Sequence, residues 1–267
     1  MLSGKNIVLT GANSGIGLEV LKLLVEGGNK VLAVDLRTDR LKEFEGKGVT
    51  PMVRDISDKE GVDAVFAEAE KVLGKIDIFY ANAGFPYFEA MNYTDWDRTR
   101  RIFDTNTISV IYSYEKFREH LAGREGRFAI TVSAIGKMAM PGYALYSASK
   151  FAVQGFQQAL RLELPENIGL TCLYPVATDT GFFKAAAEGK HKTIRRKPFP
   201  VQKPAHVAKA MVKGLARGKK TVNPCKLFTL AGVLFAICPP IKYIYWSLEK
   251  KKLDEFLAQP EETTPEK

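Results

Sequence analysis

Residues 133–150 have the sequence SAIGKMAMPGYALYSASK, which joins a strand pattern to a helix pattern. The strand pattern is RFAITV at 127–132, and it runs into Ser133. A loop with glycine and proline follows, and a periodicity typical of a helix then runs over about 143–163. The segment therefore places a hydroxyl at the end of a strand, with the start of a helix close behind it.

Two side chains of this helix can act together. Tyr146 and Lys150 are four residues apart, so they share one helix face. A nearby ammonium group favours phenolate and lowers the pKa of a tyrosine from its usual value of about 10. Such a phenol can give or take a proton at working pH, and the Ser133 hydroxyl can point at the same place. Tyr-x-x-x-Lys alone is common, however, and also fits a helix face that is simply solvated.

Length and composition indicate one large α/β domain with a full core, since the chain has 267 residues of which 46% are hydrophobic. We expect no secretory signal, because the first apolar run is short and enters a glycine loop. The cysteines form no CxxC pattern, which favours reduced thiols and a cytoplasmic protein. The histidines are scattered, and we expect no metal site. The cysteines are Cys172, Cys225 and Cys238.

The net charge of +9 is unevenly distributed. Residues 184–226 hold 13 Lys and Arg against one acid, a net of +12, which leaves −3 for the rest of the chain. A basic run can be a solvated surface, or it can attract an anionic partner. This segment has few aromatic side chains to stack on bases and no recognised module, so we expect no nucleic-acid partner.

A glycine-rich turn follows the first predicted strand. The apolar run 7–9 enters residues 10–17, TGANSGIG, and an amphipathic helix pattern follows to about Glu26. In this arrangement, backbone amides can approach a pyrophosphate at the positive helix N-terminus. The spacing is GxxxGxG and not the GxGxxG of the general dinucleotide fingerprint, so a plain glycine-rich turn is the alternative.

An acidic residue closes the second predicted strand. Asp35 follows the run 31–34, about 20 residues after the glycines, where a carboxylate can accept bonds from the adenosine ribose and repel a 2′-phosphate. A capping or solvated Asp is the alternative. Arg37 and Arg40 follow closely in the sequence and could instead attract a 2′-phosphate.

Strand and helix patterns alternate along the rest of the chain, which favours a doubly wound parallel sheet with helices on both faces. Ligands bind beyond the carboxyl ends of such strands, where Asp55, Asn82 and Ser133 all lie. Asn106 falls inside a predicted helix, where Asn is unfavourable, so either a kink with a functional role or a tolerated polar residue is expected. The further predicted strands are 49–53, 76–80, 170–174 and 221–222, and the further helices are 58–73, 94–121 and 204–217.

Together these pieces resemble the main branch of the short-chain dehydrogenase/reductase family. The resemblance covers about residues 3–223 and rests on the order and spacing of several motifs. It implies a Rossmann-like α/β domain and an NAD(P)-dependent oxidoreductase that moves a hydride between the cofactor and a secondary alcohol or ketone. We expect a homo-oligomer, a dimer or a tetramer. The motifs are TGxxxGIG at 10–17, Asn82-Ala83-Gly84, Asn106, Ser133, YSASK at 146–150, and Pro175 with Thr180.

The resemblance also implies residue roles. Tyr146 is the expected general acid/base, and Lys150 lowers its pKa and holds the nicotinamide ribose. Ser133 is expected to orient the substrate oxygen, and Asn106 to support a water that relays protons. The expected cofactor contacts are Gly11, Asn13, Ser14, Gly15, Ile16, Gly17, Asp35, Asp55, Ile56, Asn82, Ala83, Gly84, Tyr146, Lys150, Pro175, Thr178 and Thr180.

Two positions bear on the choice of cofactor. Asp35 matches the NAD-preferring pattern, and Ser14 is not the basic residue that NADP-preferring members often carry there. We therefore expect NAD, with NADP less favoured. The chain departs from the family at Pro175-Val176, where Pro-Gly is usual, and this suggests a stiffer loop over the nicotinamide.

The chain continues into an apolar extension, expected over 224–257 and followed by a disordered tail over 258–267. Residues 227–241 carry no charge, but 15 residues fall short of the roughly 20 needed to span a bilayer, and prolines interrupt the run. We expect two helices that pack on the domain, 1–223, or on a second subunit. The alternative is a peripheral position at an anionic membrane surface.

Apolar side chains are expected to flank the site and suit a lipophilic substrate of steroid, retinoid or long-chain type better than a sugar. The alternative function is a non-catalytic dinucleotide-binding sensor or scaffold on the same fold. Intact Ser133, Tyr146 and Lys150 favour the enzyme. The apolar candidates are Phe85, Tyr87, Phe88, Met91, Met138, Met140, Phe182 and Phe183.

Overall fold

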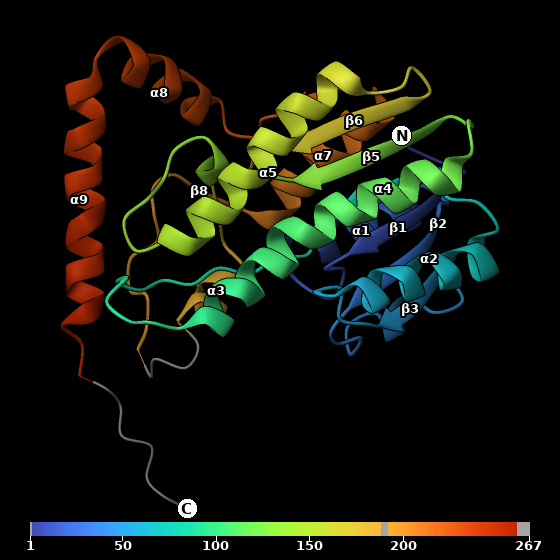
Figure 1. Ribbon diagram of the computed structural model, residues 1–267, viewed down its shortest axis with the longest axis horizontal. Coiled ribbons are helices and arrows are strands. Elements are labelled where there is room, and N and C mark those ends of the chain that lie inside the picture. The colour runs from blue at the N-terminus through green and yellow to red at the C-terminus, as the bar shows by residue number, and fades with distance from the viewer. Residues whose placement is uncertain (1, 188–191, 261–267) are drawn as a thin grey trace, which may run out of the picture.

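The computed structural model describes residues 2–187 and 192–260, which form a seven-stranded parallel sheet with helices around it (Figure 1). The strand order is β3-β2-β1-β4-β5-β6-β9. The order reverses at β1, which pairs with both β2 and β4, and a doubly wound sheet binds ligands in the crevice at such a switch point. The strands are β1 (Asn6–Thr10), β2 (Lys30–Asp35), β3 (Val49–Val53), β4 (Ile78–Ala81), β5 (Gly126–Thr131), β6 (Ile168–Leu173) and β9 (Thr221–Val222).

Helices cover both faces of the sheet, which confirms the predicted fold class. One core cluster joins the strands to α2 (Lys59–Leu73), α4 (Ser109–Leu121) and α5 (Ala144–Glu163). The other joins them to α1 (Gly15–Glu26) and α7 (Pro204–Ala216). Because both faces are buried, the strands are nearly continuous apolar runs, as in parallel sheets generally.

Strand β2 shows how the two clusters share one strand. Leu32 and Val34 belong to the cluster under α2, α4 and α5, whereas Val31 and Ala33 belong to the one under α1 and α7. Successive side chains of a strand point to opposite faces, so a short run of four buried residues supplies both layers.

The single helix predicted over 94–121 has three parts. It begins as α3 (Trp96–Phe103), whose first turn is capped by the Asp95 carboxylate, and it continues through a π-helical turn, Asp104–Ile108, into α4. Asn106 lies in the π-helical turn, so the irregularity that its residue type suggested is present. The short elements had no sequence prediction: η1 (Lys42–Phe44), η3 (Ala134–Gly136), β7 (Ala177–Thr178), α6 (Phe182–Ala186) and β8 (Val201–Gln202).

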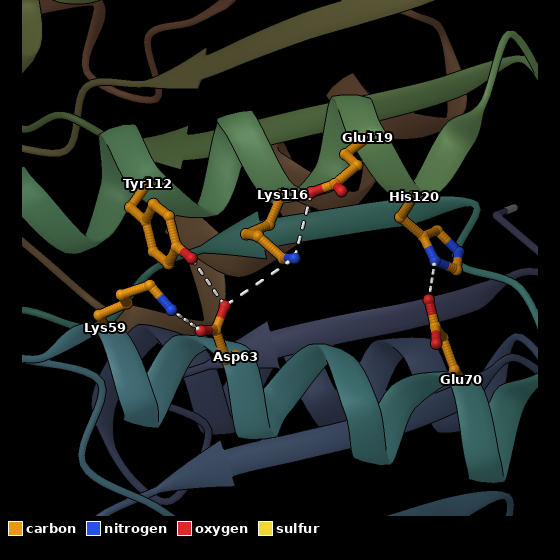
Figure 2. A network of polar contacts seen from close by, with 7 residues as sticks. All are labelled: Lys59, Asp63, Glu70, Tyr112, Lys116, Glu119 and His120. Atoms are coloured by element: carbon orange, nitrogen blue, oxygen red, sulfur yellow. Dashed lines mark hydrogen bonds and ion pairs between the residues drawn. The ribbon is translucent and has the colours of Figure 1, made fainter.

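Polar contacts join the outer surfaces of α2 and α4. Figure 2 shows Asp63 of α2 between Lys59, Tyr112 and Lys116, with the Tyr112 hydroxyl donating to its carboxylate at 2.8 Å. The bond from Lys59 is the main cause that lowers the pKa of Asp63. Exposed ion pairs add little stability, so the network chiefly fixes how the two helices lie against each other.

A histidine joins the same two helices to the turn that precedes β4. Nε2 of His120 accepts the backbone N–H of buried Ile76 at 3.0 Å, which leaves the proton on Nδ1. Nδ1 lies 2.9 Å from a carboxylate oxygen of Glu70 and donates to it (Figure 2). His120 therefore satisfies a backbone donor that water does not reach.

The two predicted C-terminal helices are present as α8 (Lys226–Ile237) and α9 (Pro239–Leu257), and they lie at one side of the molecule, away from the sheet (Figure 1). Helix α9 packs on the domain and buries Glu249 and Phe256, whereas no residue of α8 is buried. Buried side chains are thus observed for α9, whereas α8 contacts α9 through the ring of Phe235 on Tyr245 and buries no residue. Residues 261–267 of the predicted tail lie outside the described residues.

Candidate active site

A cavity of about 470 Å³ opens at the carboxyl ends of β1, β4 and β5. Among the predicted site residues, Asn13 and Asn106 do not line it, and all the others do. These others are Gly11, Ser14, Gly15, Ile16, Gly17, Asp35, Asp55, Ile56, Asn82, Ala83, Gly84, Ser133, Tyr146, Lys150, Pro175, Thr178 and Thr180. The structure therefore brings together residues that are up to 169 positions apart in the chain.

The glycine turn is shaped by close backbone approach. A Cβ on Gly17 would lie 1.9 Å from the carbonyl oxygen of Gly11, so no side chain fits there. Gly11 has φ = 67°, a left-handed conformation that L side chains rarely adopt. The turn leads into the N-terminus of α1, whose first N–H groups have no partner within the helix and suit an anionic group.

Asn82, which follows β4, holds the glycine turn from the neighbouring strand. Its Nδ2 donates to the carbonyl oxygens of Thr10 at 3.1 Å and Gly11 at 3.2 Å, and its Oδ1 accepts from Thr131 at 2.9 Å. The Thr10 hydroxyl in turn accepts the N–H groups of Asn82 and Ala83. Sequence reasoning quoted Thr10 only as part of the glycine motif and missed Thr131. The available signal was that each is the last residue of a strand.

Asp35 closes β2 at the edge of the cavity. Its carboxylate accepts the backbone N–H groups of Asn13 at 2.9 Å and Arg37 at 3.3 Å. The Arg37 guanidinium pairs with Asp39 at 3.1 Å instead. Asn13, predicted to touch the cofactor, uses its side chain to donate to Asp39 and to accept the N–H of Arg40. Asn13 thus positions the loop beside Asp35 and lies outside the cavity wall.

Ser133 lies after β5 with a strained backbone. Its φ of 85° and ψ of 148° fall in a region that residues other than glycine rarely adopt. Such a conformation costs about 1–3 kcal/mol and is typical of functional sites. Its hydroxyl accepts the N–H of Ile135 at 3.3 Å and lies close enough to the phenol of Tyr146 to lower the pKa of that group. The strained turn therefore directs this hydroxyl at the predicted acid/base.

The predicted effect of Lys150 on Tyr146 is not seen. Burial raises the pKa of Tyr146 to about 12, and the bond with Ser133 opposes this only in part. Burial also lowers the pKa of Lys150 to about 8. The Lys150 ammonium donates to the carbonyl oxygen of Thr131 at 3.0 Å and lies 5.9 Å from the centre of the Tyr146 ring. Desolvation is therefore the main cause of both shifts.

Asn106 supports the site from behind its wall. Its side chain accepts the N–H of Phe85 at 3.0 Å and donates to the carbonyl oxygen of Phe85 at 2.9 Å and to the Ser149 hydroxyl at 3.1 Å. It thereby connects the loop after β4 to the helix of Tyr146. The predicted role in a water relay stays a prediction, and the contacts make Asn106 a positioning residue.

The other half of the cavity wall is apolar. From the sequence-based set, Phe85, Met138, Met140, Phe182 and Phe183 line it. Phe88 does not, because it is buried against Tyr143 and against Phe256 of α9. Tyr87 packs under the Arg98 guanidinium at 3.6 Å, and Met91 is exposed. The predicted apolar lining is therefore correct for the loops that face the catalytic residues.

The C-terminal extension completes this wall, which sequence reasoning missed. Phe228 of α8 and Tyr245 of α9 line the cavity. The Tyr245 hydroxyl donates to the carbonyl oxygen of Phe199 at 3.0 Å, and Trp246 donates to that of Ala139 at 2.8 Å. Helix α9 therefore holds in place the loops that contain Ala139 and Phe199, which border the apolar side of the cavity.

Comparison with known proteins identifies this arrangement. A sequence model of the family described as short chain dehydrogenase matches residues 5–191. The chain belongs to that family. Its members use nicotinamide cofactors, and this chain is an oxidoreductase of the family.

Curated relatives and solved structures agree with this assignment. SadH of Mycobacterium tuberculosis, named as an oxidoreductase, is 31% identical over 82% of this chain and 85% of its own. The 3-dehydrosphinganine reductase of Danio rerio is 29% identical over 82% of this chain and 71% of its own. A short-chain dehydrogenase from Burkholderia phymatum, solved with NAD, has a TM-score of 0.79 at 20% identity, covering 91% of this chain and 97% of its own.

The residues present fit a nicotinamide dinucleotide. The glycine turn leaves a space beside its backbone that a Cβ would fill. It leads into a helix N-terminus, which suits a pyrophosphate. The Asp35 carboxylate lies where an adenosine ribose is bound in such folds, and the same cavity continues to Tyr146 and Lys150. Thr180 lies over the turn, because a Cβ on Gly15 would be 3.3 Å from its methyl group.

Proposed function

We propose that this short-chain dehydrogenase is an NAD-dependent enzyme that interconverts a lipophilic secondary alcohol and its ketone. The observation that carries the proposal is a single cavity in which Ser133, Tyr146 and Lys150 lie opposite an apolar wall. The NAD preference and the substrate class are the parts that go beyond family membership.

The protein residues would divide the work as follows. Bound nicotinamide supplies the hydride chemistry. Tyr146 gives a proton to the carbonyl oxygen in reduction and takes the alcohol proton in oxidation, with Ser133 holding the same oxygen by a hydrogen bond. Lys150 lies between the Thr131 carbonyl and the cofactor side of the cavity, where its ammonium would hold the ribose.

A lipophilic substrate is supported by two observations. The wall that faces Tyr146 carries Phe182, Phe183 and Met140, and the extension adds further aromatic side chains to it. The relative from Danio rerio is named as a reductase of 3-dehydrosphinganine, a long-chain ketone. Apolar walls with a few placed polar groups are typical of sites for such compounds.

A screen of secondary alcohols and ketones would test the substrate class. With NAD or NADH and detection at the nicotinamide absorbance, we expect turnover of steroid, retinoid or long-chain compounds and little turnover of polyols. Activity confined to small polar polyols would refute the lipophilic assignment.

The cofactor preference depends on Asp35. Its carboxylate would repel the 2′-phosphate of NADP, so calorimetric titration is expected to give tighter binding of NAD than of NADP. Asp35→Ser is expected to reduce the ratio of the Kd for NADP to the Kd for NAD by about tenfold, which corresponds to about 1.4 kcal/mol. Tighter NADP binding by the unmodified protein would mean that Arg37 or Arg40 dominates. Glu43→Ser is the matched control, because Glu43 is an exposed acid that does not line the cavity.

The remaining proposals concern organisation. We place the catalytic domain at 1–223 and the extension at 224–257, and we propose a cytoplasmic homo-oligomer of two or four chains. A dinucleotide-binding sensor on the same fold is the second candidate function. It would bind NAD with no turnover of any alcohol. The presence of Ser133, Tyr146 and Lys150 in one cavity favours the enzyme, because a sensor has no use for a proton relay.

A further inference from the structure

One face of α8 is apolar and exposed along its whole length. Leu227, Leu230, Leu234 and Ile237 follow each other at helical spacing, and Leu230 and Ile237 are 67% and 77% exposed. The opposite side faces the protein, since Phe228 lines the cavity and the Phe235 ring stacks on Tyr245 at 6.0 Å. A surface helix normally carries polar residues on its outer face, so this face is expected to be covered.

The exposed apolar face continues onto the start of α9. Tyr243, Ile244 and Leu248 are each more than half exposed. The Lys242 ammonium lies 4.8 Å from the centre of the Trp246 ring, a pairing of residue types that is enriched at the boundary between lipid and water. None of the described helices is long and apolar enough to cross a membrane, and α8 itself is only about 18 Å long.

Charge distinguishes between the partners that could cover this face. Residues 192–226, which precede it directly, contain 11 Lys and Arg and no Asp or Glu. Lys226 and Lys242 border the uncharged stretch at both ends. Lys226 and Lys242 therefore place positive charge at both ends of this face, which a second copy of the chain would repel and an anionic lipid surface would attract.

We propose that this face of α8 and the start of α9 bind reversibly to an anionic lipid surface. The apolar side chains enter the boundary region of the bilayer while the neighbouring basic residues contact the headgroups. The same helices form part of the cavity wall through Phe228 and Tyr245, so the cavity would lie next to the lipid. This last point rests on the proposed lipophilic substrate, but the lipid binding itself does not.

Sedimentation with vesicles tests the proposal without any need for turnover. The full chain is expected to pellet with phosphatidylserine/phosphatidylcholine vesicles at low salt. Pelleting should weaken at high salt, because the electrostatic screening length becomes shorter. Leu230→Glu and, independently, Ile237→Glu should each lower the partition coefficient between vesicles and buffer by about tenfold. The matched control is Leu162→Glu, the same change at a 90% exposed position of α5, and it should pellet like the unmodified protein.

Three results would overturn the proposal. The first is no pelleting with anionic vesicles at low salt. The second is equal pelleting with pure phosphatidylcholine vesicles and no response to salt. The third is a loss of oligomer mass in Leu230→Glu, seen by sedimentation velocity without vesicles, because that result would identify a second copy as the partner. Circular dichroism of each variant shows that it is folded.

Discussion

Tyr146→Phe is expected to lower kcat by about 10²–10⁴-fold, because the change removes the transferable proton. The ring itself should stay in place, since it packs edge-on against Phe182 at 5.4 Å between ring centres and this contact needs no hydroxyl. NAD affinity measured by calorimetry should change little. Rates are measured with any alcohol or ketone that the screen finds active.

Tyr143 offers a matched control one helical turn away. It is buried, lines the same cavity, and its hydroxyl makes no hydrogen bond to any residue that the structure describes. Tyr143→Phe should therefore change kcat far less than Tyr146→Phe and should not lower stability. Full turnover in Tyr146→Phe, or equal losses in both variants, would contradict the role given to Tyr146.

The pH dependence should differ between the two directions. Because burial raises the pKa of Tyr146 to about 12, its phenol is protonated near neutral pH and is ready to donate in reduction. Oxidation needs the phenol as a proton acceptor, so its kcat/KM should rise with pH through the alkaline range while that of reduction does not. The rise of kcat/KM with pH in the oxidation direction should be lost in Tyr146→Phe.

Gly17→Ala is expected to have the second large effect. Its Cβ would lie 1.9 Å from the Gly11 carbonyl oxygen and 2.8 Å from Nδ2 of Asn82, so the backbone of the turn must move. We expect the free energy of unfolding in urea to fall by about 1–3 kcal/mol. The Kd for NAD should rise by about tenfold or more, because the moved amides are those that would face the pyrophosphate.

Gly155→Ala is the control for this change. Gly155 lies within α5, and a Cβ there meets nothing within 4 Å. Replacement by Ala should raise stability by about 0.5–1 kcal/mol, since glycine is unfavourable in helix interiors. NAD affinity should be unchanged. Unaltered NAD binding in Gly17→Ala would show that the turn does not hold the cofactor.

The cofactor half of the site was predictable because its residues follow strands. Glycine spacing after β1, Asp35 after β2, and Asn82 after β4 place functional groups at one edge of a parallel sheet. Asn13 was misplaced because an Asn in a turn can bond to its own loop as readily as to a ligand, and here it does so.

The substrate half was less predictable for two physical reasons. Its wall includes Phe228 and Tyr245, whose helices pack beside the site although they lie far from it in the chain, and periodicity does not say where a helix docks. The pKa of Tyr146 depends on burial, which raises it here and which residue spacing alone does not report.

The most direct test of the central claim is transfer of deuterium from NADH or NADPH deuterated at both C4 positions to a ketone, followed by mass spectrometry. The unmodified enzyme is expected to place one deuterium on the carbinol carbon of the product, with far less product from Tyr146→Phe in the same time. Binding of the cofactor with no deuterated product from any ketone in the screen would contradict the enzymatic assignment and favour the sensor.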